Sequence, residues 1–263
     1  GGRRSHNSRW HSNMVTSAEV ATVFGYLGMV LTTVYFLSPA PTCYNIIKQK
    51  DIQQYSPVPY AVGVVNCGLW VYWYIITMEV TGENLTPNLA VNALGLLLFL
   101  GYVTVFVVYA RSRLREVGTV LLLCGMFFAA LMLLFEGVVP RFGDGLFKSH
   151  VSGLITDVIN VLLYGSPMVV MRTVIRTKSV KYLPLPMSLL TLVICILWSV
   201  QAICISNLTI LVPNALGILL GIAQLTLYAM YCRNPVCDDE EADSRSLMLS
   251  TSFHLHVSNS FHG

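Results

Sequence analysis

The sequence predicts an all-α membrane protein of seven transmembrane helices, built as two parallel three-helix repeats joined by a linker helix. Three observations predict it: an apolar composition, long runs without charge, and repeated motif spacing. Of the 263 residues, 55% are Ala, Val, Ile, Leu, Met, Phe, Trp, Tyr or Cys and only 11% are Asp, Glu, Lys or Arg, whereas a soluble domain carries about 25% charged residues. This composition excludes a soluble two-domain enzyme, a disordered protein and a nucleic-acid-binding protein.

Charge-free runs predict the individual spans, because a helix needs about 20 apolar residues to cross a bilayer. Asp, Glu, Lys and Arg are absent from 20–47, 52–78, 84–110, 117–135 and 182–232, and 149–171 contains only Asp157. The last run is too long for one span and predicts two helices joined by a turn near 206–209. The predicted spans are 20–47, 58–78, 88–110, 117–135, 150–171, 184–205 and 210–231. They must be helices, because they lack the alternation of membrane-barrel strands and unpaired backbone is costly in hydrocarbon.

The loop charges predict the orientation. Most Lys and Arg residues lie in the loops after the first, third and fifth spans and in the C-terminal tail, and such residues concentrate on the cytosolic side. We therefore expect a multi-pass protein with its N-terminus outside and its C-terminus in the cytosol. The plasma membrane is the expected site of residence, with an internal membrane as the alternative. The first helix is a retained span rather than a signal peptide. Residues 1–18 are predicted to be a disordered extracellular segment, and residues 233–263 a disordered cytosolic tail.

The chain repeats itself. Asn92-Ala-Leu-Gly matches Asn214-Ala-Leu-Gly, Pro39 precedes Lys50 by the same 11 residues that separate Pro167 from Lys178, and each Lys precedes a Trp, Trp70 or Trp198, by 20 residues. Shared order with shared spacing indicates an internal repeat. The predicted organisation is a first repeat at 19–110, a linker helix with its loops at 111–145, and a second repeat at 146–232. One extra crossing gives both three-helix units the same orientation.

In order and duplicated, these motifs closely resemble the SWEET family of sugar uniporters over about residues 19–232. The strings that carry the resemblance are Leu37-Ser-Pro-Ala-Pro-Thr42, Lys48-Gln-Lys50, Pro59-Tyr60, Asn66-Cys-Gly-Leu-Trp70, Tyr164-Gly-Ser-Pro167, Thr177-Lys-Ser-Val180, Pro184, Trp198, Pro213-Asn-Ala-Leu-Gly217, Gln224-Leu225 and Leu227-Tyr228. The resemblance implies facilitative sugar transport by alternating access, with a sugar substrate, the lipid bilayer and a second copy of the chain as partners. It implies no cofactor, and no nucleic acid is expected.

The resemblance also implies the site residues. Asn92 and Asn214 match family positions that contact the sugar, and Trp70 and Trp198 match positions that line the pocket. Four prolines match a gating set near one end of the pathway; they are Pro39, Pro59, Pro167 and Pro184.

The chemistry of these residues agrees with such roles but leaves alternatives open. An Asn amide offers two donors and an acceptor to a sugar, or it could simply join helices. A Trp face can stack on a pyranose, or it could lie in the interfacial aromatic belt or face lipid. A proline kinks a helix by removing a hydrogen bond, yet Pro59 and Pro184 could instead mark helix starts.

Two departures from the family concern shape. Tyr74 and Ala202 stand where the family usually has Gly, which alters close helix contacts. Trp70 occupies a position that often holds a smaller residue, so both Trp side chains narrow the predicted site. We therefore expect a monosaccharide such as glucose or fructose rather than sucrose.

Asp157 is the acidic residue inside a predicted span, and an intramembrane carboxylate marks a functional site by default. It could bond a neighbouring helix, contact water near the outer mouth or relay protons. The last option favours an alternative function, a proton-coupled PQ-loop amino-acid carrier, although the chain contains no Pro-Gln dipeptide. A seven-span receptor is disfavoured by the duplication. An enzyme is not expected, because no span carries paired acids or a Ser–His pair.

Two further features concern modification and metals. Asn84-Leu-Thr86 and Asn207-Leu-Thr209 match the N-glycosylation pattern, on the predicted outer side. The seven cysteines have no Cys-x-x-Cys spacing, so neither a metal site nor a disulfide framework is expected.

Overall fold

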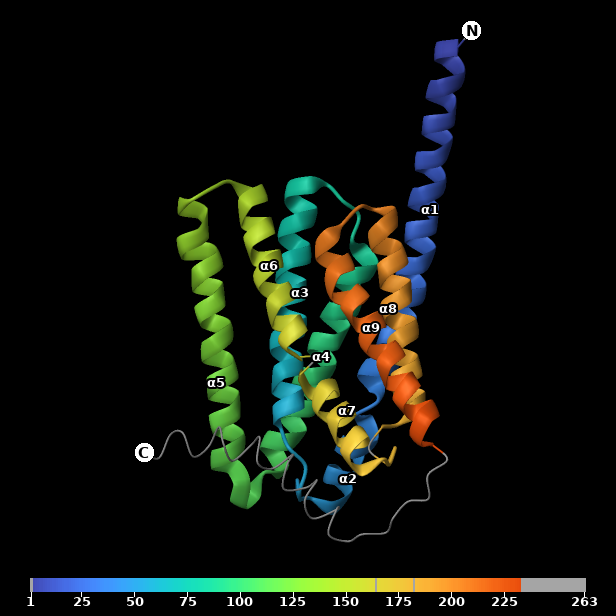
Figure 1. The fold of residues 1–263 in the computed structure, drawn as a ribbon. Coiled ribbons are helices and arrows are strands. Elements are labelled where there is room, and N and C mark those ends of the chain that lie inside the picture. The colour runs from blue at the N-terminus through green and yellow to red at the C-terminus, as the bar shows by residue number, and fades with distance from the viewer. Residues whose placement is uncertain (1, 164, 182, 233–263) are drawn as a thin grey trace.

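The computed structural model describes residues 2–163, 165–181 and 183–232, with side chains from residue 17 onward apart from 112 and 166, and its elements are all helices (Figure 1). The predicted disordered tail, 233–263, lies outside the described residues. In chain order the main helices are α1 (Gly2–Leu37), α2 (Ala40–Gln49), α3 (Val58–Thr81), α4 (Thr86–Tyr109), α5 (Leu114–Leu133), α6 (Gly145–Leu163), α7 (Gly165–Thr177), α8 (Leu185–Cys204) and α9 (Leu208–Tyr231).

Seven segments of the described chain are long and apolar enough to cross a membrane, which confirms the predicted fold class. They are Ser17–Gln49, Val58–Thr81, Thr86–Tyr109, Leu114–Arg141, Gly145–Thr177, Leu185–Cys204 and Leu208–Tyr231. The fourth segment extends α5 through a π-helical turn at Leu134–Val138 and a 3-10 turn at Val139–Arg141. The predicted spans agree with these bounds to within six residues, because charged and turn-forming residues limit each apolar run.

The first and fifth spans are each broken near a proline. α1 ends at Leu37 and α2 begins at Ala40, with Pro39 as its N-cap residue. In the second repeat, α6 ends at Leu163, and Pro167 lies in the first turn of α7. Proline cannot donate a backbone hydrogen bond and is best tolerated in the first turn of a helix, so both breaks lie where the sequence places them.

The N-terminal segment differs from its prediction. The sequence predicts disorder for residues 1–18, whereas α1 begins at Gly2 and projects well beyond the bundle (Figure 1). The helix can continue upstream because residues 3–24 contain neither Gly nor Pro, the two residues that end helices most effectively. Polarity alone therefore does not distinguish a disordered segment from a solvated helical extension.

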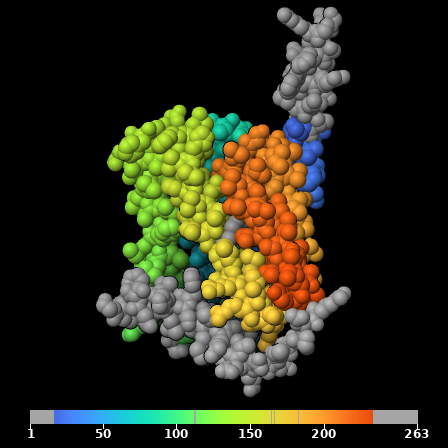
Figure 2. All heavy atoms as spheres, in the orientation of Figure 1, coloured from blue at the N-terminus to red at the C-terminus, as the bar shows by residue number. Residues whose placement is uncertain are grey.

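Helix packing is symmetric between the two halves. Within each half, α3 packs on α4 as α8 packs on α9, and α1 packs on α4 as α6 packs on α9. Between the halves, α1 contacts α8 as α6 contacts α3. Figure 2 shows the side chains of α6 and α9 meeting on one face of the bundle. The linker helix α5 packs beside α3 and α4 at the edge of the bundle (Figure 1).

The turns repeat the same symmetry. Lys50 after α2 and Lys178 after α7 both have left-handed backbones, with φ of 54° and 51°. At the opposite end of the bundle, Gly82 after α3 and Ser206 after α8 have φ of 71° and 57°. A left-handed residue ends a helix by turning the chain away. We call the end with the α3–α4 and α8–α9 turns the predicted outer end, and the opposite end the predicted inner end.

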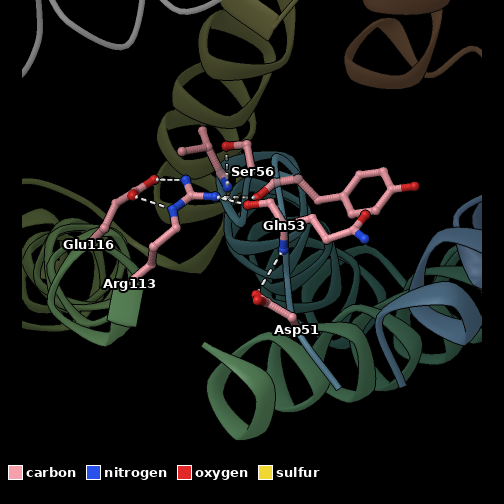
Figure 3. Close-up of polar contacts among 7 residues, drawn as sticks. Asp51, Gln53, Ser56, Arg113 and Glu116 are labelled. Atoms are coloured by element: carbon pink, nitrogen blue, oxygen red, sulfur yellow. Dashed lines mark hydrogen bonds and ion pairs between the residues drawn. The ribbon is translucent and has the colours of Figure 1, made fainter. Parts of the chain in front are cut away.

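Arg113 ties the linker to the first half at the predicted inner end (Figure 3). Its Nη1 atom donates to the backbone oxygens of Gln53 (2.6 Å) and Tyr55 (3.3 Å), and its Nε atom donates to Glu116 Oε2 (2.9 Å). The loop is shaped further by the backbone N–H of Gln53, which donates to Asp51 Oδ1 (3.0 Å). The Arg113 guanidinium can bond the Gln53, Tyr55 and Glu116 oxygens at once because its donors form a rigid fork.

Candidate functional site

Asn92 and Asn214 occupy equivalent places, six residues after the first residues of α4 and α9. Each side chain donates from Nδ2 to the carbonyl oxygen four residues earlier, at 2.9 Å to Asn88 and 2.7 Å to Ile210. Within the described part of the chain, neither amide bonds to another helix. This local bond holds each amide in one orientation and leaves its Oδ1 acceptor and a second N–H donor for a bound molecule.

Trp70 and Trp198 are both buried, with 7% of each residue exposed. Trp70 stacks on Tyr74 at 5.5 Å and meets Trp73 edge-on at 5.6 Å. Trp198 donates from Nε1 to Thr32 Oγ1 at 3.0 Å. Both Trp residues belong to one apolar cluster that draws side chains from both halves. They therefore lie inside the bundle, which excludes the lipid-facing and interfacial alternatives.

The four predicted gating prolines all lie at the predicted inner end, but in two kinds of place. Pro39 and Pro167 lie at the broken helices described above. Pro59 is the second residue of α3, and Pro184 is the N-cap residue of α8. The last two mark helix starts, which is the alternative left open by the sequence, and they remove no helical hydrogen bond there.

Sequence reasoning missed Asn88 on α4 and Gln201 on α8. Asn88 Nδ2 donates to Gln201 Oε1 at 2.9 Å, and Gln201 Nε2 donates to Asn88 Oδ1 at 3.0 Å. Both residues are almost fully buried, at 1% and 2% exposure. Asn88 lies one helical turn from Asn92 towards the predicted outer end. The repeat does not mark this pair, since the equivalent positions in the other halves hold Ile210 and Trp73.

Other polar contacts join the two halves in the predicted outer half of the bundle. Asn207 Nδ2 donates to Glu83 Oε2 at 3.0 Å, and the hydroxyls of Thr77 and Ser149 share a hydrogen bond of 2.7 Å. Trp73 Nε1 donates to the Ser149 carbonyl at 3.1 Å. Together with the buried Asn88–Gln201 pair, these bonds close the outer half of the bundle.

A cavity of about 240 Å³ lies on the outer side of this closure. Its lining residues come from α1, the α3–α4 turn, the start of α4 and the end of α8, and include Tyr26, Glu83, Asn84, Pro87 and Gln201. Gln201 thus both lines the outer cavity and pairs with Asn88. The amide pair therefore lies at the wall of this cavity.

The two positions that depart from the family glycines are filled. Tyr74 is 4% exposed and Ala202 is fully buried, and both belong to the apolar cluster that contains the two Trp residues. Side chains larger than hydrogen are thus accommodated at both places. The large ring at 74 provides the surface on which Trp70 stacks.

The Asn side chains of the two N-glycosylation motifs differ in their exposure and hydrogen bonding. Asn84 is exposed, and its Oδ1 accepts bonds from the backbone and the hydroxyl of Thr86 at 3.2 and 2.7 Å. Asn207 instead caps α9 by accepting from the Ile210 amide at 3.2 Å, while its Nδ2 bonds Glu83. Both polar atoms of the Asn207 side chain therefore make hydrogen bonds within the protein.

Asp157 lies on α6 and is half-buried. Its Oδ1 atom has no hydrogen-bond partner among the described residues. The sequence left open that Asp157 bonds a neighbouring helix, and the described residues show no such bond at Oδ1. Of the predicted site residues, the structure brings Trp70 and Trp198 into one apolar cluster, and none of them lines the outer cavity.

Comparison with known proteins agrees with this arrangement. Residues 22–114 and 150–236 match a family described as "Sugar efflux transporter for intercellular exchange". The chain is 32% identical over 221 residues to bidirectional sugar transporter SWEET7b of Oryza sativa subsp. indica, covering 84% of this chain and 81% of that protein. It is 33% identical over 227 residues to bidirectional sugar transporter SWEET16 of Arabidopsis thaliana, covering 85% and 95%.

A solved structure gives the same result. The fold superposes on a eukaryotic SWEET transporter with a TM-score of 0.74 at 26% identity, covering 83% of this chain and all of the other.

Proposed function

Because this chain belongs to the SWEET family of sugar transporters, we propose that it carries monosaccharides down their concentration gradient by alternating access. Family membership confirms the resemblance noted in the sequence. The observation that carries the proposal is the pair Asn92 and Asn214, which come from the two halves and are held by the same local hydrogen bond. A carrier of this kind belongs to no enzyme class, and it is a multi-pass membrane protein.

Substrate binding would use the hydrogen-bonding groups that Asn92 and Asn214 leave unoccupied and the faces of the two buried Trp rings. The Oδ1 acceptors of Asn92 and Asn214 would receive hydrogen bonds from sugar hydroxyls, and the buried faces of Trp70 and Trp198 would cover the C–H face of the ring. A few hydrogen bonds of about 1 kcal/mol each match a dissociation constant of roughly 1 mM, which corresponds to about −4 kcal/mol. Weak binding suits a carrier, because the substrate must also leave.

Alternating access needs one closure at each end of the pathway, and each closure must be able to open. We assign the outer closure to the buried amides of Asn88 and Gln201, which the two halves contribute separately. At the inner end, the breaks at Pro39 and Pro167 let α2 and α7 swing without unravelling α1 and α6. Rocking of one half against the other would then expose Asn92 and Asn214 first to one side of the membrane and then to the other.

The loop charges support a finer localisation. Lys and Arg are concentrated in the loops at the predicted inner end, so we assign that end to the cytosol and the α3–α4 turn to the outside. With this orientation, the cavity at Tyr26 and Glu83 is an outer vestibule. We propose the plasma membrane as the site of residence, which surface biotinylation of intact cells would test.

Transport by the purified full chain in proteoliposomes tests the function. Radiolabelled glucose should equilibrate without accumulating, and a proton gradient of either direction should leave the initial rate unchanged. Glucose should enter faster than sucrose, because the two buried Trp residues narrow the site. Accumulation of glucose against its own gradient would contradict uniport and favour a proton-coupled carrier.

A further inference from the structure

Asp157 is a carboxyl group in the middle of a membrane span. It lies twelve residues after the start of α6, and the bounds of that span are Gly145–Thr177. Neither of the two ion pairs in the described chain, Arg113–Glu116 and Lys148–Glu136, includes it. Burying a carboxylate costs free energy unless it is paired and hydrogen-bonded. A ligand that donates hydrogen bonds to Asp157 would reduce that cost.

The packing of α6 sets the depth of Asp157. Gly153 fits between Trp73 and Thr209, because a Cβ atom there would lie 2.6 Å from Trp73 Nε1 and 3.1 Å from Thr209 Cγ2. From that level α6 and α9 run in the same direction (Figure 1), each rising 1.5 Å per residue. One helical turn further in, Asp157 therefore comes level with Pro213, the neighbour of Asn214.

Asp157 also lies near Tyr74, a member of the apolar cluster that contains the two Trp residues. Asp157 lies within electrostatic range of the hydroxyl of Tyr74, which also interacts with the side chain of Asn88. Tyr74 in turn stacks on Trp70. Asp157 therefore lies near the level of Asn214 on α9 and within electrostatic range of the residue on which Trp70 stacks.

Asp157 is one of several buried polar side chains that have an atom without a hydrogen-bond partner. In the described part of the chain, four buried side-chain atoms lack a partner: Oδ1 of Asn66, Oγ1 of Thr156, Oδ1 of Asp157 and Oγ of Ser199. Three of the four belong to the packed pair α3 and α6. Buried polar groups are normally satisfied, so each of these atoms is free to accept a hydrogen bond from a polar ligand.

We infer that Asp157 is a further substrate-binding residue, which accepts hydrogen bonds from the transported sugar and gives the carrier a preference for amino sugars. This inference rests on the proposed transport function. A neutral hydroxyl can donate to the carboxylate, but a protonated amine brings both donors and the missing positive charge. Bonds between charged partners are about twice as strong as neutral ones, and exclusion of water strengthens them further.

Competition measurements test the assignment in proteoliposomes that contain the full chain. Uptake of radiolabelled glucose is inhibited with unlabelled glucosamine or unlabelled glucose at neutral pH, where most of the amine is protonated. The two competitors have nearly the same size and differ in charge. In the unaltered protein, glucosamine should inhibit about tenfold more strongly than glucose, the size expected for a hydrogen bond to a charged group.

Two variants locate that preference. Asp157→Asn keeps a side chain of the same shape but removes the charge, so the glucose uptake that remains should be inhibited equally by the two competitors. Asp144→Asn is the matched control, because it removes a carboxylate from the exposed start of the same helix, where Asp144 Oδ1 accepts from the Phe147 amide at 3.0 Å. This control should keep the preference.

The outcomes separate the two proposals. Glucose transport without any preference for glucosamine in the unaltered protein overturns the role of Asp157 and leaves the transport function standing, whether or not the variant folds. The same conclusion follows if Asp157→Asn retains the preference. Failure of the unaltered protein to transport any sugar overturns the proposed function itself.

Discussion

Asn88 and Gln201 exchange two hydrogen bonds, of 2.9 and 3.0 Å, although they lie 113 residues apart in the sequence. Each side chain satisfies the other, and neither has more than 2% of its surface exposed. A reciprocal amide pair of this kind holds α4 of the first half against α8 of the second. Because it can break without leaving a charge behind, it suits a closure that must open in every transport cycle.

Breaking this pair should favour opening at the outer end. Asn88→Leu alone leaves the Gln201 amide buried and unpaired, which costs the closed state about 1–3 kcal/mol. The double variant Asn88→Leu/Gln201→Leu replaces both amides by apolar groups and should recover much of that loss. A double-mutant cycle on thermal stability in detergent measures the coupling. Additive effects of the two single variants would show that the pair does not act as a unit.

Removing either site asparagine should abolish most transport. Asn92→Ala and Asn214→Ala each delete an oriented amide while leaving the backbone of α4 or α9 intact. Initial glucose uptake by proteoliposomes should therefore fall steeply in both. Thr104→Ala is the matched control on α4, because Thr104 is exposed and bonds only its own helix, at 2.8 Å to the Leu100 carbonyl. Normal uptake by either Asn variant would remove it from the substrate site.

Lys50 should tolerate glycine better than its neighbour Lys48 does. Lys50 has a left-handed backbone with φ of 54°, a conformation that costs a side-chain-bearing residue of order 1 kcal/mol and costs glycine little. Lys50→Gly should therefore leave the melting temperature unchanged or raise it. Lys48 lies within α2, and Lys48→Gly should lower stability by roughly 0.5–1 kcal/mol. Equal losses in both variants would count against a strained turn at Lys50.

Gly153 should resist enlargement, whereas Gly101 should accept it. A Cβ atom at Gly153 would lie 2.6 Å from Trp73 Nε1, a contact that forces either α6 or the indole to move. Overpacking of this kind costs about 1–3 kcal/mol, so Gly153→Ala should melt earlier. Gly101 is exposed on α4 with nothing within 4 Å of an added Cβ, and Gly101→Ala should be neutral or stabilising by up to about 1 kcal/mol.

The Gly153 variant also bears on the substrate site. A shift of α6 would move Asp157 away from the level of Asn214, since both depend on the contact between Gly153 and Thr209. Glucose uptake by Gly153→Ala should therefore fall more than the loss of stability explains. Uptake at the normal rate per folded molecule would show that the site tolerates displacement of α6.

The sequence by itself determined the number and bounds of the spans, the class of fold and the family. A bilayer admits only helices of limited length, so runs without charge and breaks near Pro39 and Pro167 are local signals that need no knowledge of neighbours. Asn92, Asn214, Trp70 and Trp198 could be singled out for the same reason. Each Asn recurs within the same Asn-Ala-Leu-Gly motif, and each Trp recurs 20 residues after a matching Lys.

Only the tertiary structure decided which side chains meet. Asn88 and Gln201 are single amides without repeated counterparts, and nothing near them in sequence indicates a partner. Trp198 was distinguished from a lipid-facing ring by the Thr32 hydroxyl that it binds from another helix. Asp157 gained its neighbours from the level at which α6 meets α9. Such contacts depend on the relative rotation and depth of helices that are distant in the chain, and hydropathy does not encode either quantity.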